Sequence, residues 1–187
     1  VSRGLGDVYK RQAQYGLVVA LTNAGRADEA ALELDNIWSG DPDRLEYVIA
    51  DAEIDMLRGD AEKAATKLEK QLALSPGNHP LTMTYANALM KNQQAHIAEE
   101  VLVAQSKRRP KDPGLWYLLA EVQGLSGNII GLHQSRAEYF ILNGILDQAE
   151  KQLKYALKLI NNDYLTSAKI NQRLSDISEM RRRMEQF

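Results

Sequence analysis

Several landmark residues recur along the chain at one fixed interval of 34 residues. They are two glycines, three alanines, three leucines and three prolines, and each set keeps the same spacing. An interval shared by several residue types predicts consecutive units with one local structure, each burying its apolar face on its neighbours. The recurring residues are Gly25 and Gly59; Ala30, Ala64 and Ala98; Leu34, Leu68 and Leu102; and Pro42, Pro76 and Pro110.

Each landmark has a physical role in a pair of antiparallel helices. The alanines let the second helix approach the first closely. The glycines supply the left-handed conformation that ends a first helix, and the prolines lie just past second helices, which they cannot continue. An interval of 34 residues is the period of the tetratricopeptide repeat. The sequence therefore predicts an all-α fold, a tetratricopeptide-type α-solenoid of about four to five helix pairs with one shared helix and a C-terminal capping helix.

The repeat register predicts where the helices lie. Gln93 stands where a turn glycine is expected, and we expect Asn92 to take the left-handed conformation instead. The next turn glycine after Gly127 is Gly144, which comes half a repeat later. The helix over 130–142 is therefore predicted to be the second of one pair and the first of the next. The other predicted helices span 13–23, 27–39, 43–57, 61–74, 80–91 and 95–108, then one starting near 113, one carrying Ala149, Leu153 and Ala156, and a last one over 163–184.

The chain divides into three predicted parts. Residues 1–12 (VSRGLGDVYKRQ) show no helical period and lie outside the register, so we interpret them as a non-native leader. The solenoid is predicted over 13–161 and the capping helix within 162–187. The residues predicted to face inward include Leu17, Leu21, Leu34 and Ile37 at the start, and Leu165, Ala168, Leu174, Ile177 and Met184 on the last helix.

Composition narrows the partners. The net charge of −2 gives no reason to expect nucleic acid, and glutamates are interleaved with the basic residues near the C-terminus. The chain has no cysteine, so it has neither a disulfide framework nor a thiolate metal site. No apolar run is long enough to span a bilayer.

The first helices of successive pairs are predicted to line a concave groove that binds polypeptide. The mixture of residues there is apolar and acidic, without the lysine and asparagine that would hold a free carboxylate. Methionines and tyrosines would suit an extended or partly folded polypeptide. The alternative is that some of the methionines fill gaps between helices. The predicted groove residues are Tyr15, Val19, Ile49, Glu53, Met56, Met83, Asn87, Met90, Tyr117, Glu121 and Glu138.

The sequence carries no recognisable catalytic or metal motif. There is no H-E-x-x-H, no glycine-rich phosphate loop and no G-x-S-x-G. His96 and Glu99 could share one helix face, as two zinc ligands do, but a third ligand is missing and Ala98 between them is a packing landmark. We therefore expect no catalytic residue, no metal and no cofactor in this chain.

Four short stretches carry a more specific resemblance. They are 76–80 (PGNHP), 85–89 (YANAL), 109–121 (RPKDPGLWYLLAE) and 132–140 (LHQSRAEYF). Together with the half-repeat shift, they resemble the C-terminal tetratricopeptide region of the bacterial periplasmic zinc metalloproteases that assist outer-membrane β-barrel assembly and quality control. The resemblance extends from about Ala13 to Ile160.

The resemblance implies a docking role. In that family an upstream domain carries the zinc site and the proteolytic activity, so the zinc would belong to a domain absent from this chain. The repeats would contact that domain, outer-membrane β-barrel proteins and their assembly machinery, in the periplasm. Two alternatives remain open: a free-standing adaptor of a pilus-assembly or secretion system, and an enzyme that uses His96 and Glu99 with zinc.

Overall fold

The structure is a computed structural model that describes residues 2–38 and 44–184, with side chains from Tyr9 onward. Within these residues every regular element is an α-helix, and there are ten of them. The predicted all-α class is therefore confirmed. The landmark Pro42 and the predicted helix ends at residues 39 and 43 lie outside the described residues.

Contacts between residues divide the chain into two compact units, 1–94 and 95–187. Each unit contains five helices. The first unit contains α1 (Ser2–Asn23), α2 (Ala27–Trp38), α3 (Leu45–Leu57), α4 (Ala61–Leu74) and α5 (His79–Lys91). The second contains α6 (Ala95–Arg108), α7 (Pro113–Ser126), α8 (Ile129–Leu142), α9 (Leu146–Leu159) and α10 (Tyr164–Met184).

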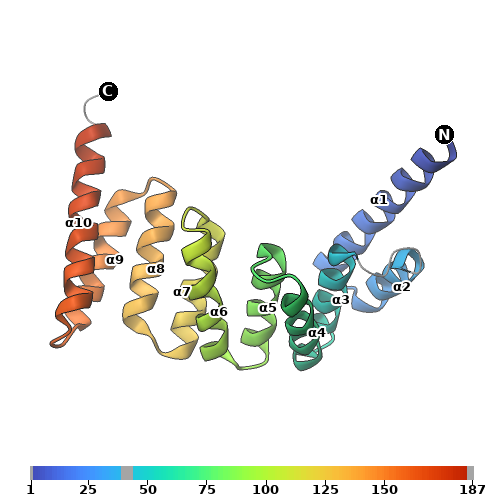
Figure 1. The fold of residues 1–187 in the computed structure, drawn as a ribbon, viewed down its shortest axis with the longest axis horizontal. Helices are drawn as coiled ribbons and strands as arrows, with labels where there is room; N and C mark the ends of the chain where they lie inside the picture. Colours follow the sequence, from blue (N-terminus) through green and yellow to red (C-terminus); the bar gives the residue numbers. More distant parts are fainter. Residues whose placement is uncertain (1, 39–43, 185–187) are drawn as a thin grey trace. The chain divides into compact units, whose positions relative to one another are not determined.

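Helix α3 is the centre of the first unit. It packs against α1, α2, α4 and α5 (Figure 1). The landmark alanines Ala30 and Ala64 are completely buried, as the close approach of paired helices requires. Tyr47 and Ile54 of α3 lie in the same core as Leu34 of α2. The repeat landmarks therefore mark the helix contacts of this unit.

In the second unit, consecutive helices pack side by side (Figure 1). Helix α8 contacts both α7 and α9, as the half-repeat shift predicts for a shared helix. The landmarks Ala98 and Leu102 are completely buried on α6, and Ala149 is completely buried on α9. Helix α10 packs against α9 and covers it with Ile170 and Ile177.

The interval of 34 residues is also present in the backbone. A residue with positive φ ends the first helix of each successive pair, and the same conformation returns half a repeat later. Asn92 has φ −84°, so our prediction that it replaces the turn glycine is wrong. The left-handed residues are Gly25 (φ +73°), Gly59 (+88°), Gln93 (+59°), Gly127 (+81°) and Gly144 (+73°).

Two predicted faces differ from the structure. Helix α1 starts at Ser2 rather than near Ala13, and its buried residue is Val18, whereas Leu17 is exposed. On α10, Leu165 and Met184 are exposed. The buried line of α10 runs through Ile170 and Ile177 instead, with Leu174 and Met180 partly buried beside it. A sequence in which apolar residues occur on adjacent helix positions does not decide which of them faces the neighbour. The assignment of 1–12 as a leader stays a prediction, as does the boundary between the solenoid and the cap.

Candidate functional site

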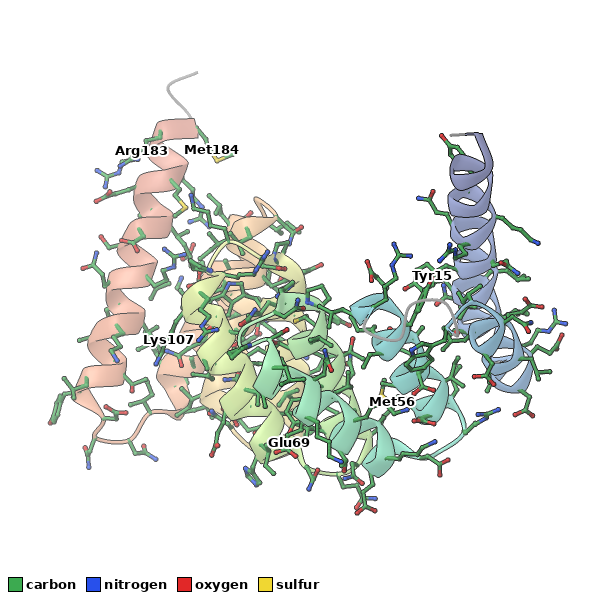
Figure 2. The ribbon with its side chains drawn as sticks, turned by 45° about the vertical axis from the view of Figure 1, so that its right-hand side comes forward. Tyr15, Met56, Glu69, Lys107, Arg183 and Met184 are labelled. Atoms are coloured by element: carbon green, nitrogen blue, oxygen red, sulfur yellow. The ribbon has the colours of Figure 1, made fainter. Side chains whose placement is uncertain are left out.

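In the first unit, the predicted groove residues lie on α1, α3 and α5. Helix α3 contacts both of the other two, so the three first helices form one layer. Tyr15 of α1 lies where α1 meets α3 (Figure 2), with its ring centroid 5.8 Å from that of Tyr47. Burial raises the pKa of the Tyr15 hydroxyl, and the nearby carboxylates of Glu53 and Glu46 raise it further. The structure therefore brings Tyr15 and Glu53 together, as the register predicts.

The other predicted residues of this unit differ in exposure. Val19 and Asn87 are exposed, whereas Ile49, Met83 and Met90 are half-buried. Met56 is buried at 9% exposed, so it packs in the core rather than lining a groove. The physical reason is that α3 has packing partners on nearly every side, which leaves little of its surface to solvent. The alternative that a methionine fills a gap between helices is correct for Met56.

In the second unit, Tyr117 of α7 is 52% exposed and lies next to Tyr139 of α8, with ring centroids 5.6 Å apart. Tyr139 also contacts Phe140 edge-on, at 5.5 Å. A hydrogen bond to Glu121, one turn further along α7, raises the pKa of Tyr117. We call Tyr117, Glu121 and Tyr139 the aromatic–acidic patch. It presents two phenol rings and one carboxylate on adjacent helices.

Local sequence fixes the start of both helices that carry this patch. The Asp112 side chain accepts a hydrogen bond from the Leu115 amide at 3.1 Å and caps α7. The Trp116 indole donates to the Pro110 carbonyl at 2.9 Å, which ties the preceding loop to α7. Asn128 caps α8 by accepting a hydrogen bond from the Gly131 amide at 2.9 Å. These contacts set the register in which Tyr117 and Tyr139 meet.

Tyr139 is the residue that our groove prediction missed. Adding half a repeat to Glu121 leads to Glu138, whereas the side chain beside Tyr117 is the next one along. Successive residues of a helix differ by about 100° around its axis, so an error of one position changes the face. The available signal was the aromatic pair Tyr139-Phe140 on the shared helix.

Glu138 itself does not belong to the patch. Its carboxylate accepts two hydrogen bonds from the Arg173 guanidinium of α10, at 2.7 Å and 2.6 Å. That contact joins α8 to the last helix. The prediction that Glu138 lines the groove is therefore wrong, because a carboxylate held by a bidentate arginine is already satisfied.

The His96–Glu99 pair is also part of a structural network. Although burial alone would raise its pKa, hydrogen bonds from Ser126, Asn128 and Gln123 lower the pKa of Glu99 below its ordinary value. The Ser126 hydroxyl donates to Glu99 at 2.6 Å and joins α6 to α7. Within residues 2–38 and 44–184, no group of three potential metal ligands is present. Glu99 thus faces the turn between α7 and α8 as a packing residue.

A mixed-charge cavity of about 940 Å³ lies along α3 and α4 of the first unit. Lys67 lines it and pairs with Asp51 and, at 2.7 Å, with Asp55, which is only 1% exposed. Burial lowers the pKa of Lys67, so desolvation offsets part of the energy of these ion pairs. Because acidic and basic groups alternate here, the cavity shows no preference for one charge.

The chain is similar in sequence to known repeat proteins. A family model described as tetratricopeptide repeat matches residues 55–122. The chain is 26% identical over 178 residues to the beta-barrel assembly-enhancing protease of Escherichia coli K12, and 25% identical over 175 residues to the protein of the same name from Yersinia pestis. The first alignment covers 95% of this chain and 36% of the relative, so the chain spans about a third of the curated relatives' length. The predicted resemblance is confirmed.

Solved structures share the fold. MamA from Desulfovibrio magneticus RS-1, from residue 41 to its end, matches with a TM-score of 0.61 at 17% identity, covering 91% of this chain and 96% of that one. A thermophilic tetratricopeptide protein from Thermus thermophilus matches with a TM-score of 0.57 at 19% identity, covering 88% of this chain and 98% of that one. At such identities these likenesses establish the fold alone, and they confirm the tetratricopeptide-type solenoid.

Proposed function

We propose that this chain is the polypeptide-docking region of a larger bacterial protease of the kind that enhances β-barrel assembly. The observation that carries the proposal is the exposed aromatic–acidic patch, Tyr117, Glu121 and Tyr139, on a repeat scaffold. The sequence similarity over 95% of the chain supports the kind of protein to which the scaffold belongs. Docking, rather than chemistry, would be the contribution of these repeats.

The side chains of the patch suit the binding of non-native polypeptide. Tyrosine offers a large contact area with few rotatable bonds, and its hydroxyl can bond to a main-chain group. In the first unit, Tyr15 and Glu53 repeat the same combination of phenol and carboxylate, next to the half-buried Met83 and Met90. Methionine adapts its shape to different partners. Both units would therefore accept apolar segments with little sequence preference.

Three properties of the longer protein are part of the proposal. Its proteolytic activity and its zinc would belong to the portion outside this chain. The repeats would bind that portion as well as outer-membrane β-barrel proteins and their assembly machinery. The protein would act in the periplasm. The described part of the chain contains no helix that is both long and apolar enough to cross a membrane.

The test is a binding measurement with a non-native β-barrel protein as the probe. A labelled outer-membrane β-barrel protein, diluted from urea, is titrated with the chain while fluorescence anisotropy is recorded. We expect Tyr117→Asp to weaken binding about tenfold, because it places a charge where the partner buries apolar surface. The matched control is Tyr164→Asp, since Tyr164 is 83% exposed at the start of α10, outside the patch.

Two further measurements complete this experiment. Circular dichroism must show the same helix content for both variants, so that a loss of binding cannot come from unfolding. Equal binding by wild type and Tyr117→Asp would contradict the proposed role of the patch. Elemental analysis of the purified chain tests the alternative zinc enzyme, for which one zinc per chain would be required.

A further inference from the structure

The outer face of α9 carries a row of lysines around one tyrosine. Leu146, Ala149, Leu153 and Ala156 are buried on the inner face of this helix. The opposite face is exposed and consists of residues one or two helical turns apart. We call this set the lysine–tyrosine stripe; it contains Lys151, Lys154, Tyr155 and Lys158.

Contacts with neighbouring side chains hold the centre of the stripe in place. The Tyr155 ring packs against the His133 ring of α8, with centroids 5.6 Å apart. His133 is fixed in turn by a hydrogen bond between its Nδ1 and the Gln152 Oε1, at 2.7 Å. The Lys151 and Lys158 ammonium groups each lie 5.9 Å from the centroid of the Tyr155 ring. The two charges are therefore positioned on either side of an anchored aromatic ring.

These two lysines keep their charge available. The neighbouring carboxylates of Asp147 and Glu150 already pair with Arg181, and Glu150 also pairs with Lys154. Among the described residues, no carboxylate pairs with Lys151 or Lys158. A shallow cavity of about 380 Å³ runs along this surface. The stripe is thus locally positive on a chain whose net charge is −2.

We propose that the lysine–tyrosine stripe binds an acidic polypeptide segment. Lys151 and Lys158 are seven residues apart, which is about 10 Å along a helix. In an extended, polyproline-like segment, residues three apart lie on one side and about 9 Å from each other. A segment with a carboxylate at every third position would therefore place one carboxylate on each lysine, and its intervening residues would contact Tyr155.

A polypeptide fits this surface better than an anionic membrane does. Each lysine near a charged bilayer contributes only about 1 kcal/mol, and two available charges are too few for stable attachment. The flanking carboxylates of Asp147 and Glu150 would also repel a sheet of negative headgroups. A narrow segment can follow the row of lysines and avoid those carboxylates.

The second unit contains another basic cluster, over residues 107–111, which is the natural rival. There Lys107 and Arg108 lie in the last turn of α6, where positive charge is favoured by the helix dipole. Those charges already have a structural role within their own helix. Lys151 lies in the middle of α9, where no such role exists.

The test uses a labelled synthetic peptide with glutamate at every third position and proline between, titrated with the whole chain under fluorescence anisotropy. We expect binding that weakens about tenfold both in Lys151→Glu/Lys158→Glu and in Lys151→Gln/Lys158→Gln, because two charge-assisted contacts are lost. A glutamine version of the peptide should not bind. Raising the salt concentration should weaken the interaction.

The control is Lys107→Glu/Lys111→Glu, which changes charge equally in the same unit (Figure 2 labels Lys107). It should retain wild-type binding. The proposal is overturned if the peptide does not bind, if the control loses as much affinity as the stripe variants, or if phosphatidylglycerol vesicles bind and the peptide does not. The stripe lies apart from Tyr117 in sequence and on another helix, so stripe variants should bind the non-native β-barrel protein normally, whatever the fate of the proposed function.

Discussion

Arg173 of α10 donates two hydrogen bonds to the Glu138 carboxylate of α8, at 2.7 Å and 2.6 Å. The contact reaches past α9, which lies between these helices in sequence. It gives α8 a polar connection to the last helix in addition to the apolar contacts that Ile170 and Ile177 make within the same core. The last helix is therefore held to the repeats by both apolar packing and a paired charge.

Removing this arginine should destabilise the second unit. We expect Arg173→Ala to lower the free energy of unfolding by about 2 kcal/mol, because hydrogen bonds to a charged partner that is partly buried are worth more than exposed ones. Urea unfolding followed by circular dichroism measures the change. The control is Arg183→Ala, whose pair with Glu179 is long, at 3.6 Å, and exposed. It should change stability by less than about 0.5 kcal/mol. Equal effects of the two substitutions would show that the Glu138 contact adds nothing.

Two glycines on helices should respond oppositely to alanine. A Cβ at Gly131 would lie 2.6 Å from Asn128 Nδ2 and from Gln123 Nε2, both of which bond to Glu99. We expect Gly131→Ala to destabilise the chain by about 1–3 kcal/mol, because those amides must move. Gly16 of α1 has no atom within 4 Å of its Cβ position. Gly16→Ala should therefore stabilise by about 0.5–1 kcal/mol. Thermal unfolding of both variants decides, and a stable Gly131→Ala would mean that the network yields easily.

Glu99 should contribute stability that depends on pH. Hydrogen bonds from Ser126, Asn128 and Gln123 hold the pKa of Glu99 below its ordinary value of 4.5, against the opposing effect of burial. The folded state therefore favours the carboxylate. Its contribution is complete above pH 4.5 and is lost as the pH falls through the lower folded pKa.

The matched measurement compares Glu99→Gln with Glu100→Gln, an exposed neighbour on the same helix. We expect Glu99→Gln to cost about 1–2 kcal/mol near neutral pH and progressively less below pH 4.5. Glu100→Gln should follow the wild type at every pH. A difference between wild type and Glu99→Gln that stays constant down to pH 3 would contradict the role of this carboxylate.

The turn at Gln93 predicts a stabilising substitution. Gln93 has φ +59°, where a side chain costs about 1–2 kcal/mol that glycine avoids. Glycine loses about 0.5–1 kcal/mol through its greater freedom in the unfolded chain, so we expect Gln93→Gly to stabilise by about 0.5–1 kcal/mol. Gly59→Gln makes the reverse change at the equivalent turn and should destabilise. If both substitutions shift the unfolding midpoint in the same direction, backbone strain does not control these turns.

The fold could be read from the sequence because its landmarks act through local chemistry. Ala64 and Leu68 have one favourable environment in a helix pair, and both are completely buried. Gly59 and Gly144 mark turns for the same reason, since few other residues adopt their backbone conformation readily. Even the half-repeat shift at α8 followed from the spacing of such glycines.

The candidate site was less predictable because it depends on which side of a helix faces a partner. Tyr117 and Glu121 occupy the predicted surface, but Tyr139 replaces Glu138 after an offset of one residue. Met56 was misplaced because the burial of α3 comes from several neighbouring helices, none of which is encoded near it. Contacts between distant segments set these faces, and repeat spacing alone does not contain them.

Site-specific photo-crosslinking tests the central claim most directly. A photoreactive phenylalanine analogue is placed at position 117 or at position 164, and each protein is irradiated with a non-native outer-membrane β-barrel protein. We predict crosslinks from position 117, within the aromatic–acidic patch, and none from position 164. Equal crosslinking from both positions, or crosslinking from position 164 alone, would contradict the assignment of this repeat surface to polypeptide docking.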